Sequence, residues 1–89
     1  MYLARVYVTL KAAVNDPQGS TVLGALHMLG FDSVKQVRMG KYLELQGDQP
    51  DREAAAREVD SMCRKLLSNT VIEDFQFELE EIVAKPAVG

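Results

Sequence analysis

The segment VKQVRMGKYLELQ, residues 34–46, decides which fold this chain can adopt. It alternates in the manner of a β-strand, with apolar residues on one face and polar or aromatic residues on the other. The apolar face holds Val37, Met39, Leu43 and Leu45, and the other face holds Arg38, Tyr42 and Glu44. At ~3.3 Å per residue, such a strand would be roughly 43 Å long, whereas a compact chain of this size has a radius of gyration of about 12 Å. The strand must therefore bend or leave the domain near Gly40.

Two arrangements resolve this excess length. If Met39-Gly40 is a tight turn, the order becomes β-α-β-β-α-β, the ferredoxin-like motif of an antiparallel sheet with two helices on one face. If the chain runs on through Gly40, the two halves of the segment pair in different sheets, shared with a second copy in a segment-swapped dimer. We favour the second arrangement because Met-Gly is a poor two-residue hairpin loop compared with Asn-Gly or Asp-Gly.

Outward from this segment, the pattern predicts a strand over residues 2–10, where Tyr, Val and Thr are enriched. A helix over 17–29 follows, with Asp16 as its cap, Pro17 at its first position and Gly30 as a left-handed end. Its apolar stripe is Val22, Leu26 and Leu29.

The second half of the chain predicts another helix and another strand. The turn GDQPD precedes a helix whose inner face is Ala55, Val59, Met62 and Leu66 and which Ser68-Asn69 closes. Two acid-first pairs, Glu53 with Arg57 and Asp60 with Arg64, support its outer face. Residues 71–83 then alternate as a half-buried strand, and residues 84–89 form a tail without pattern that we expect to fray.

Composition places the chain among small globular proteins. Its 89 residues allow one domain, and 47% hydrophobic with 26% charged residues argues against disorder. A net charge of -3 without a Lys or Arg cluster makes nucleic acid an unlikely partner. We expect a cytoplasmic protein, because no apolar run could span a bilayer, no signal peptide is evident and Cys63 is the single cysteine.

Candidate catalytic groups lack the partners that chemistry requires. His27 has no second ligand for a metal, and Cys63 is most simply a small buried residue. The carboxylates Glu73, Asp74, Glu78, Glu80 and Glu81 face Arg5, Lys11 and Arg38 on other strands, so we expect cross-strand ion pairs. Arg38, Gly40, Lys41 and Tyr42 form the one compact polar and aromatic cluster, of a kind favoured in interfaces.

Four segments together resemble the PurS family, the small subunit of phosphoribosylformylglycinamidine synthase. They are VYVTLK at 6–11, DPQGSTV at 16–22, VRMGKYLEL at 37–45 and LLSNTVIEDFQFELEE at 66–81. The resemblance spans residues 2 to about 83, and four segments in order are more specific than any one of them.

The resemblance implies a non-catalytic assembly subunit that binds no cofactor itself. In this family the complex converts formylglycinamide ribonucleotide, ATP and glutamine to formylglycinamidine ribonucleotide, ADP, phosphate and glutamate, with ATP and Mg used by the complex. A dimer of the small subunit would bridge the glutaminase subunit and the large synthetase subunit. The matching motifs give structural or contact roles to Asp16, Pro17, Gln18, Gly19, Arg38, Gly40, Lys41, Tyr42, Asn69, Thr70 and Glu73.

Two other functions remain open on the sequence alone. A regulatory small-molecule-binding domain is the leading rival, since ferredoxin-like dimers can hold ligands between their subunits. An enzyme such as an acyl phosphatase would need an arginine in a phosphate-cradling loop, and DPQG at 16–19 offers only an acidic charge there.

Overall fold

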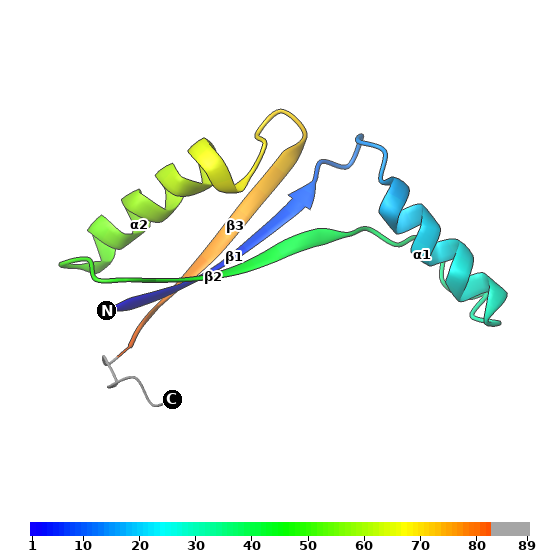
Figure 1. Cartoon of the computed structure of the whole chain (residues 1–89), viewed down its shortest axis with the longest axis horizontal. Helices are drawn as coiled ribbons and strands as arrows, with labels where there is room; N and C mark the ends of the chain where they lie inside the picture. The colour runs from blue at the N-terminus through cyan, green and yellow to red at the C-terminus, as the bar shows by residue number, and fades with distance from the viewer. Residues whose placement is uncertain (83–89) are drawn as a thin grey trace.

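The computed structural model describes residues 1–82 and shows one antiparallel sheet with helices inserted between its strands (Figure 1). The elements are β1 (Tyr2–Leu10), α1 (Pro17–Met28), β2 (Gly40–Gly47), α2 (Arg52–Met62), the π-helical turn η1 (Cys63–Leu67) and β3 (Glu73–Glu81). The sheet order is β2-β1-β3. The predicted sequence of strands and helices is confirmed, and the predicted tail at 84–89 lies outside the described residues.

Strand β1 forms the centre of the sheet, and most of its inward side chains are small and apolar. Ala4, Val6 and Val8 are buried on the face that carries α2, and β1 pairs antiparallel with both neighbours along its length. Val59 and Cys63 of the second helical segment complete this core. The half-buried side chains around it come from all three strands and η1: Leu43, Leu45, Leu67, Phe75, Phe77 and Leu79.

The middle strand is shorter than predicted. The alternation predicted a strand from Val34 onward, but β2 begins at Gly40 and residues 34–39 are not in the sheet. The register explains the difference, because Thr9 opposite Gly40 is the last pair of β1 with β2. Beyond that pair, none of the strands described in residues 1–82 is available to pair with residues 34–39.

Helix α1 does not lie on the sheet. Two helices on one face were expected, but within residues 1–82 α2 and the η1 turn that continues it pack on the strands, while α1 projects away from them (Figure 1). Residues 34–39 return alongside α1 to the sheet, so residues 17–39 form a projecting unit that we call the arm. The radius of gyration is 17.1 Å, against about 12 Å for a compact chain of this length.

Helix α2 covers only part of the sheet. It packs over β1 and β3, with Ala55 and Val59 buried beneath it. In the described part of the chain, residues 1–82, no second helix lies on the same face above β2, whose inward residues Leu43 and Leu45 are half-buried. One position in the helical layer is therefore vacant in the single chain.

The π turn changes which side chain of the second helix faces the core. Spacing predicted Leu66 on the inner face, but this side chain is 82% exposed and Leu67 packs against the core instead. The Ser68 amide donates to the Cys63 carbonyl, five residues earlier, and this wider turn shifts the helical phase by one residue.

The helix ends follow the local sequence signals. The side chains of Asp16 and Asp51 accept hydrogen bonds from the amides of Gly19 and Ala54, both at 2.8 Å. Gly30 has a φ of 96°, so the left-handed position predicted after α1 is confirmed. None of the helices in residues 1–82 combines the length and apolar character that crossing a membrane requires.

Candidate assembly interface

Most of the site residues predicted from sequence gather at one end of the sheet, where the arm joins it. Asp16 and Gly19 lie on the side where the arm begins, and Arg38 and Gly40 on the side where it ends. Hydrogen bonds and close backbone contacts join the two sides. We call this region the arm junction.

Asp16 connects the first turn of α1 to the returning segment through one carboxylate. Its Oδ1 accepts from the Gly19 amide at 2.8 Å, and its Oδ2 accepts from the Met39 amide at 2.7 Å. The side chain is 5% exposed although it is charged. The hydrogen bond from Met39, and next the one from Gly19, lower the pKa of Asp16 against the opposing effect of burial. The predicted cap is therefore also a link to the returning segment.

Arg38 fixes the loop between β1 and α1. Its guanidinium donates to the carbonyls of Val14 and Lys11, each at 2.9 Å. The prediction that Arg38 pairs with carboxylates across the sheet is wrong, because the side chain lies beyond the last pair of β1 with β2. A planar donor with two parallel N–H groups suits two neighbouring carbonyls of a turn.

Two glycines permit the backbones to approach closely at the arm junction. A Cβ on Gly19 would collide with the Val37 carbonyl oxygen, and one on Gly40 with the Val8 carbonyl oxygen. Gly24, in the same helix as Gly19, has open space around it. The two junction glycines are thus required by packing.

Pro17 and Gln18 lie on the outside of the arm junction. Together with Thr21, Val22 and Met39 they line a shallow groove along the first turn of α1. The groove is open to solvent, and Val22 and Met39 are 38% and 39% exposed. It belongs to the surface of the arm that the single chain leaves uncovered.

A second group of predicted residues shapes the start of β3. Glu73 Oε1 accepts from the Asn69 amide at 2.7 Å, and Lys41 Nζ lies 3.8 Å from Glu73 Oε2. Lys41 also donates to the Leu67 carbonyl at 3.4 Å, and the Asn69 side chain accepts from the Val71 amide at 3.1 Å. These contacts tie β2 to the turn after η1.

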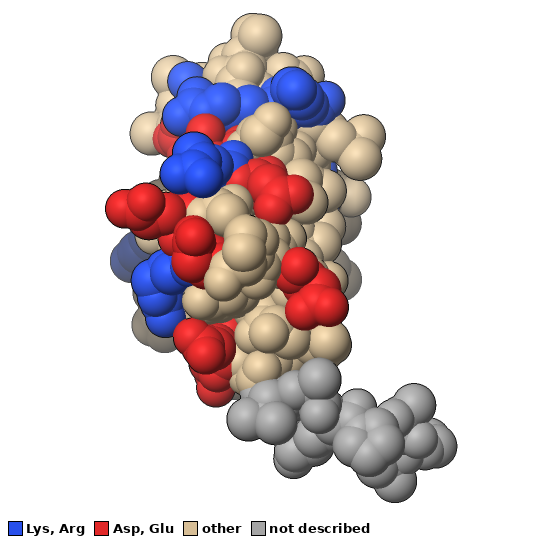
Figure 2. Space-filling model, turned by 90° about the vertical axis from the view of Figure 1, so that its left-hand side faces the viewer, with Lys and Arg blue, Asp and Glu red and all other residues tan. Residues whose placement is uncertain are grey.

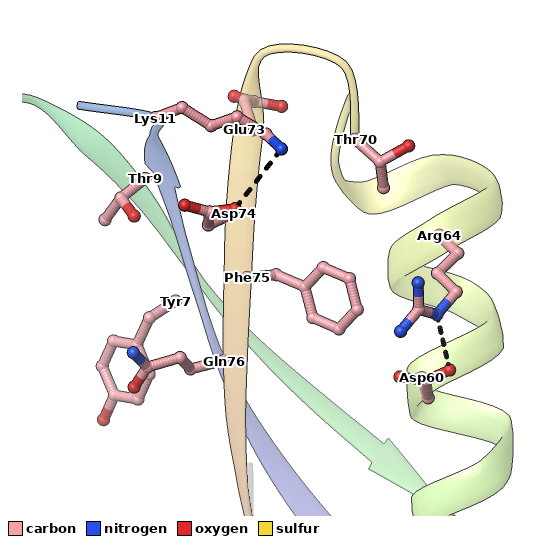
Figure 3. A pocket seen from close by; sticks show the side chains of 10 residues that line it. All are labelled: Tyr7, Thr9, Lys11, Asp60, Arg64, Thr70, Glu73, Asp74, Phe75 and Gln76. Atoms are coloured by element: carbon pink, nitrogen blue, oxygen red, sulfur yellow. Dashed lines mark hydrogen bonds and ion pairs between the residues drawn. The ribbon is translucent and has the colours of Figure 1, made fainter. Parts of the chain in front are cut away.

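Thr70 lines a broad depression of about 790 Å³ at the edge of β3 (Figure 3). Phe75, with the Arg64 guanidinium 5.3 Å from its ring centre, lies on one side of the strand. Tyr7 and Gln76 lie on the other side, because neighbouring strand residues point to opposite faces. The depression therefore wraps around an open strand edge and does not converge on one point, as an active site would.

The charged groups of this depression are engaged in ion pairs. Arg64 donates to Asp60 at 2.8 Å, the helical pair predicted from spacing, and Lys11 lies 3.8 Å from Asp74. The Lys11–Asp74 pair and the Arg5–Glu80 pair at 2.7 Å confirm the predicted pairing of strand carboxylates with Arg5 and Lys11. Within residues 1–82 no group of three His, Cys, Asp or Glu side chains could hold a metal ion.

Cys63 and His27 have structural environments. Cys63 is completely buried in the core, and burial raises the pKa of its thiol. His27 Nε2 lies 2.8 Å from the Val34 carbonyl oxygen and joins the end of α1 to the returning segment.

The arm presents apolar side chains that sequence alone could not identify as exposed. Met28 and Leu29 are 90% and 73% exposed, and Phe31 is 55% exposed. Only Leu29 belongs to the predicted inner stripe. The described part of α1 carries no acidic or basic residue except His27. A helix of this composition is normally covered by protein.

The remaining site residue, Tyr42, faces away from α2. Its ring lies 5.3 Å from that of Tyr7, centre to centre. The sequence could not reveal this pair, because the partner of each residue depends on the register of β1 with β2.

On the side of the molecule away from the arm, acidic and basic side chains are interspersed without an extended basic patch (Figure 2).

Comparison with known proteins identifies the family. The profile of the family described as "PurS: Phosphoribosylformylglycinamidine (FGAM) synthase" matches residues 3–81. The Bacillus subtilis phosphoribosylformylglycinamidine synthase subunit PurS is 52% identical over 85 residues, covering 96% of this chain and 100% of that protein.

Solved structures agree with this match. The C2 crystal form of B. subtilis PurS superimposes with a TM-score of 0.82 at 52% identity, covering 91% of this chain and 100% of that one. A chain from the structure of PurLQS from Thermotoga maritima superimposes with a TM-score of 0.80 at 27% identity, covering 90% of this chain and 99% of that one. The chain therefore belongs to the PurS family of phosphoribosylformylglycinamidine synthase subunits.

Proposed function

We propose that this chain is the assembly subunit of phosphoribosylformylglycinamidine synthase in purine biosynthesis, and that it bridges the glutaminase and synthetase subunits without catalytic residues of its own. Family membership over residues 3–81 is the observation that carries the proposal. One of the similar chains belongs to the structure of PurLQS from Thermotoga maritima, which supports a role inside a complex. The charged side chains described above are held in ion pairs, and the N-termini of α1 and α2 are capped by hydrogen bonds. These features are consistent with a contact role.

The working unit in this proposal is a segment-swapped homodimer. The single chain has an arm with exposed apolar residues, a vacant helix position above β2 and a β2 edge without a partner strand within residues 1–82. In a dimer, α1 of each copy would fill the vacant position of the other, and residues 34–39 would pair with the other copy's β2. Each half would then have four strands and two helices on one face, the ferredoxin-like arrangement.

Energetics favour this exchange over a free arm. An isolated helix of 12 residues is marginal in water, and α1 has little of the chain's own core to stabilise it. Each large apolar side chain that becomes fully buried stabilises the assembly by about 1.5–3 kcal/mol. The arm junction holds the arm in one direction, which lowers the entropy lost when two copies exchange arms.

In the assembled enzyme the dimer would hold the two larger subunits in fixed relation. Ammonia released from glutamine could then reach the synthetase site without protonation or escape into the cytoplasm. Holding the sites together raises the effective concentration of the transferred molecule without new chemistry. ATP and Mg would be bound by the larger subunits.

Reconstitution tests the proposal. The three purified subunits are assayed for product formation with glutamine and, separately, with a high concentration of ammonium as nitrogen source. We expect omission of this chain to abolish glutamine-dependent turnover and to leave ammonia-dependent turnover of the synthetase subunit largely intact. If glutamine-dependent turnover is unchanged by the omission, the bridging role is wrong.

A further inference from the structure

The face of the sheet opposite α2 remains open after the arm and the inner face are assigned to the dimer. We call it the outer face. Its side chains lie in cross-strand rows, and the row through the middle of β1 joins Tyr42, Tyr7 and Gln76. The adjacent row joins Glu44, Arg5 and Glu78. The proposed exchange of arms covers the inner face and leaves these rows exposed.

The outer face carries more carboxylates than cations can balance. Arg5 pairs with Glu80 at 2.7 Å, and Lys11 lies 3.8 Å from Asp74. Glu44 and Glu78, on either side of Arg5, have no cation within ion-pair distance among residues 1–82. This face therefore has two unbalanced negative charges next to its aromatic row.

The two tyrosines form a tilted aromatic pair within this acidic region. Their ring centres are 5.3 Å apart with 38° between the planes, and Tyr7 and Tyr42 are 37% and 52% exposed. The Tyr42 hydroxyl donates to Glu44 at 2.9 Å, which holds the ring beside that carboxylate. Exposed tyrosines with few rotatable bonds are common anchors of protein interfaces.

We propose that the outer face binds an arginine-bearing surface of another subunit of the synthase complex. A guanidinium is planar, so it can stack on the Tyr7–Tyr42 surface while it donates to the Glu44 carboxylate beside it. Glu78, in the same row as Glu44, would attract a second cation of the partner. The proposal rests on the assembly role proposed above and names the surface that performs it.

Charge argues against a second copy of this chain as the occupant. Two outer faces in contact would place the unbalanced Glu44 and Glu78 of one copy against those of the other. Like charges brought together at an interface are unfavourable, whereas a basic partner neutralises them.

Binding measurements with matched variants test the inference. Glu44→Gln with Glu78→Gln removes both unbalanced charges at nearly constant volume, and Tyr42→Ala removes half of the aromatic surface. Glu53→Gln with Glu58→Gln is the control, since both residues are exposed on α2, on the other side of the sheet. Each dimer is titrated against the isolated synthetase and glutaminase subunits at low and high salt, after circular dichroism and light scattering have verified its fold and mass.

We expect the outer-face double variant to bind one of the two subunits about tenfold more weakly at low salt, with a smaller difference at high salt. Tyr42→Ala should weaken the same interaction at least as much, at both salt concentrations, and the α2 control should bind like the wild type. If the wild type binds and the outer-face variants bind equally well, this inference is wrong while the assembly role stands. If the wild type binds neither subunit, the assembly role itself fails. Self-association of the wild-type dimer that the double variant abolishes would overturn the inference in favour of a second copy.

Discussion

Gly19 and Gly40 show that the arm junction depends on single atoms. At both positions a Cβ would collide with a carbonyl oxygen of a neighbouring segment, Val37 for Gly19 and Val8 for Gly40. A backbone carbonyl cannot move away as the end of a flexible side chain can. The direction of the arm is therefore encoded partly by the absence of a side chain.

A pair of alanine substitutions in α1 tests this requirement. We expect Gly19→Ala to reduce the free energy of unfolding by about 1–3 kcal/mol, the usual cost of overpacking. Gly24→Ala, in open space in the same helix, should increase it by about 0.5–1 kcal/mol through helix propensity. Urea denaturation of both variants measures the difference, and equal effects would show that Gly19 is not required by packing.

Asp16 makes the stability of the arm junction depend on pH. Its folded-state pKa is lowered mainly by the Met39 and Gly19 amides, so the unfolded chain takes up a proton at a higher pH than the folded one. The stability it contributes is fully present above the unfolded pKa of about 3.9 and is lost as the pH falls below it towards the folded pKa.

Denaturation as a function of pH separates this contribution from the rest of the chain. We expect Asp16→Asn to be less stable than the wild type at pH 7, with the difference shrinking as the pH falls from about 5 to 3. Asp32→Asn, at an exposed position in the turn after α1, serves as the control. A difference that stays constant over this range would contradict the role given to the Asp16 carboxylate.

At the scale of elements, the same chain contains one helix that packs against the core and one that does not. Helix α2 buries Ala55 and Val59 against the sheet, whereas Gly19 is the one buried residue of α1. Both helices have N-terminal caps and apolar residues at helical spacing, but α2 carries charged residues on its outer face, whereas α1 has no acidic or basic residue except His27. The two helices also differ in position. After β2 the chain turns back so that α2 lies over β1 and β3, whereas α1 follows the end of β1 and projects away from the strands (Figure 1).

Replacing one exposed apolar residue of the arm tests whether a second copy covers it. Leu29 is 73% exposed, so Leu29→Asp should cost the single chain little. In the proposed swapped dimer the aspartate would be buried, and we expect dissociation to monomers at micromolar concentration by analytical ultracentrifugation. Ser20→Asp lies on the opposite side of α1 from the apolar stripe and should leave the dimer intact. A wild-type protein that is already monomeric under these conditions would contradict the exchange of arms.

At the scale of the whole molecule, the extended shape couples stability to concentration. Among residues 1–82 of the single chain seven apolar residues are buried, which is a small core for a domain of this length. If much of the apolar surface is buried only between copies, unfolding and dissociation occur together.

Thermal unfolding at several protein concentrations measures this coupling. We expect Tm to rise by several degrees between about 1 and 100 μM chain, because mass action favours the dimer. Leu29→Asp should remove the dependence as well as lower Tm. A wild-type Tm that does not change with concentration would show that the single chain folds independently.

The sequence by itself determined the elements that local patterns control. Strand β1 and the start of α1 lie where alternation and the Asp16-Pro17 cap placed them, and β3 alternates as predicted. The excess length of segment 34–46 also indicated that the strand bends or leaves the domain near Gly40, although β2 starts six residues later than predicted. Residues 34–39 have the same alternating pattern as β2, and only the register shows that β1 has ended before it could pair with them.

Only the tertiary structure decided which of these surfaces are covered. The π turn replaced Leu66 with Leu67 at the core, and the sheet register brought Tyr7 and Tyr42 together. Asp16 and Arg38 met at the arm junction from positions 22 residues apart, through backbone groups that a sequence pattern does not specify. Periodicity reports the environment of a residue along its own element, whereas covering, register and close backbone approach depend on segments that are distant in the sequence.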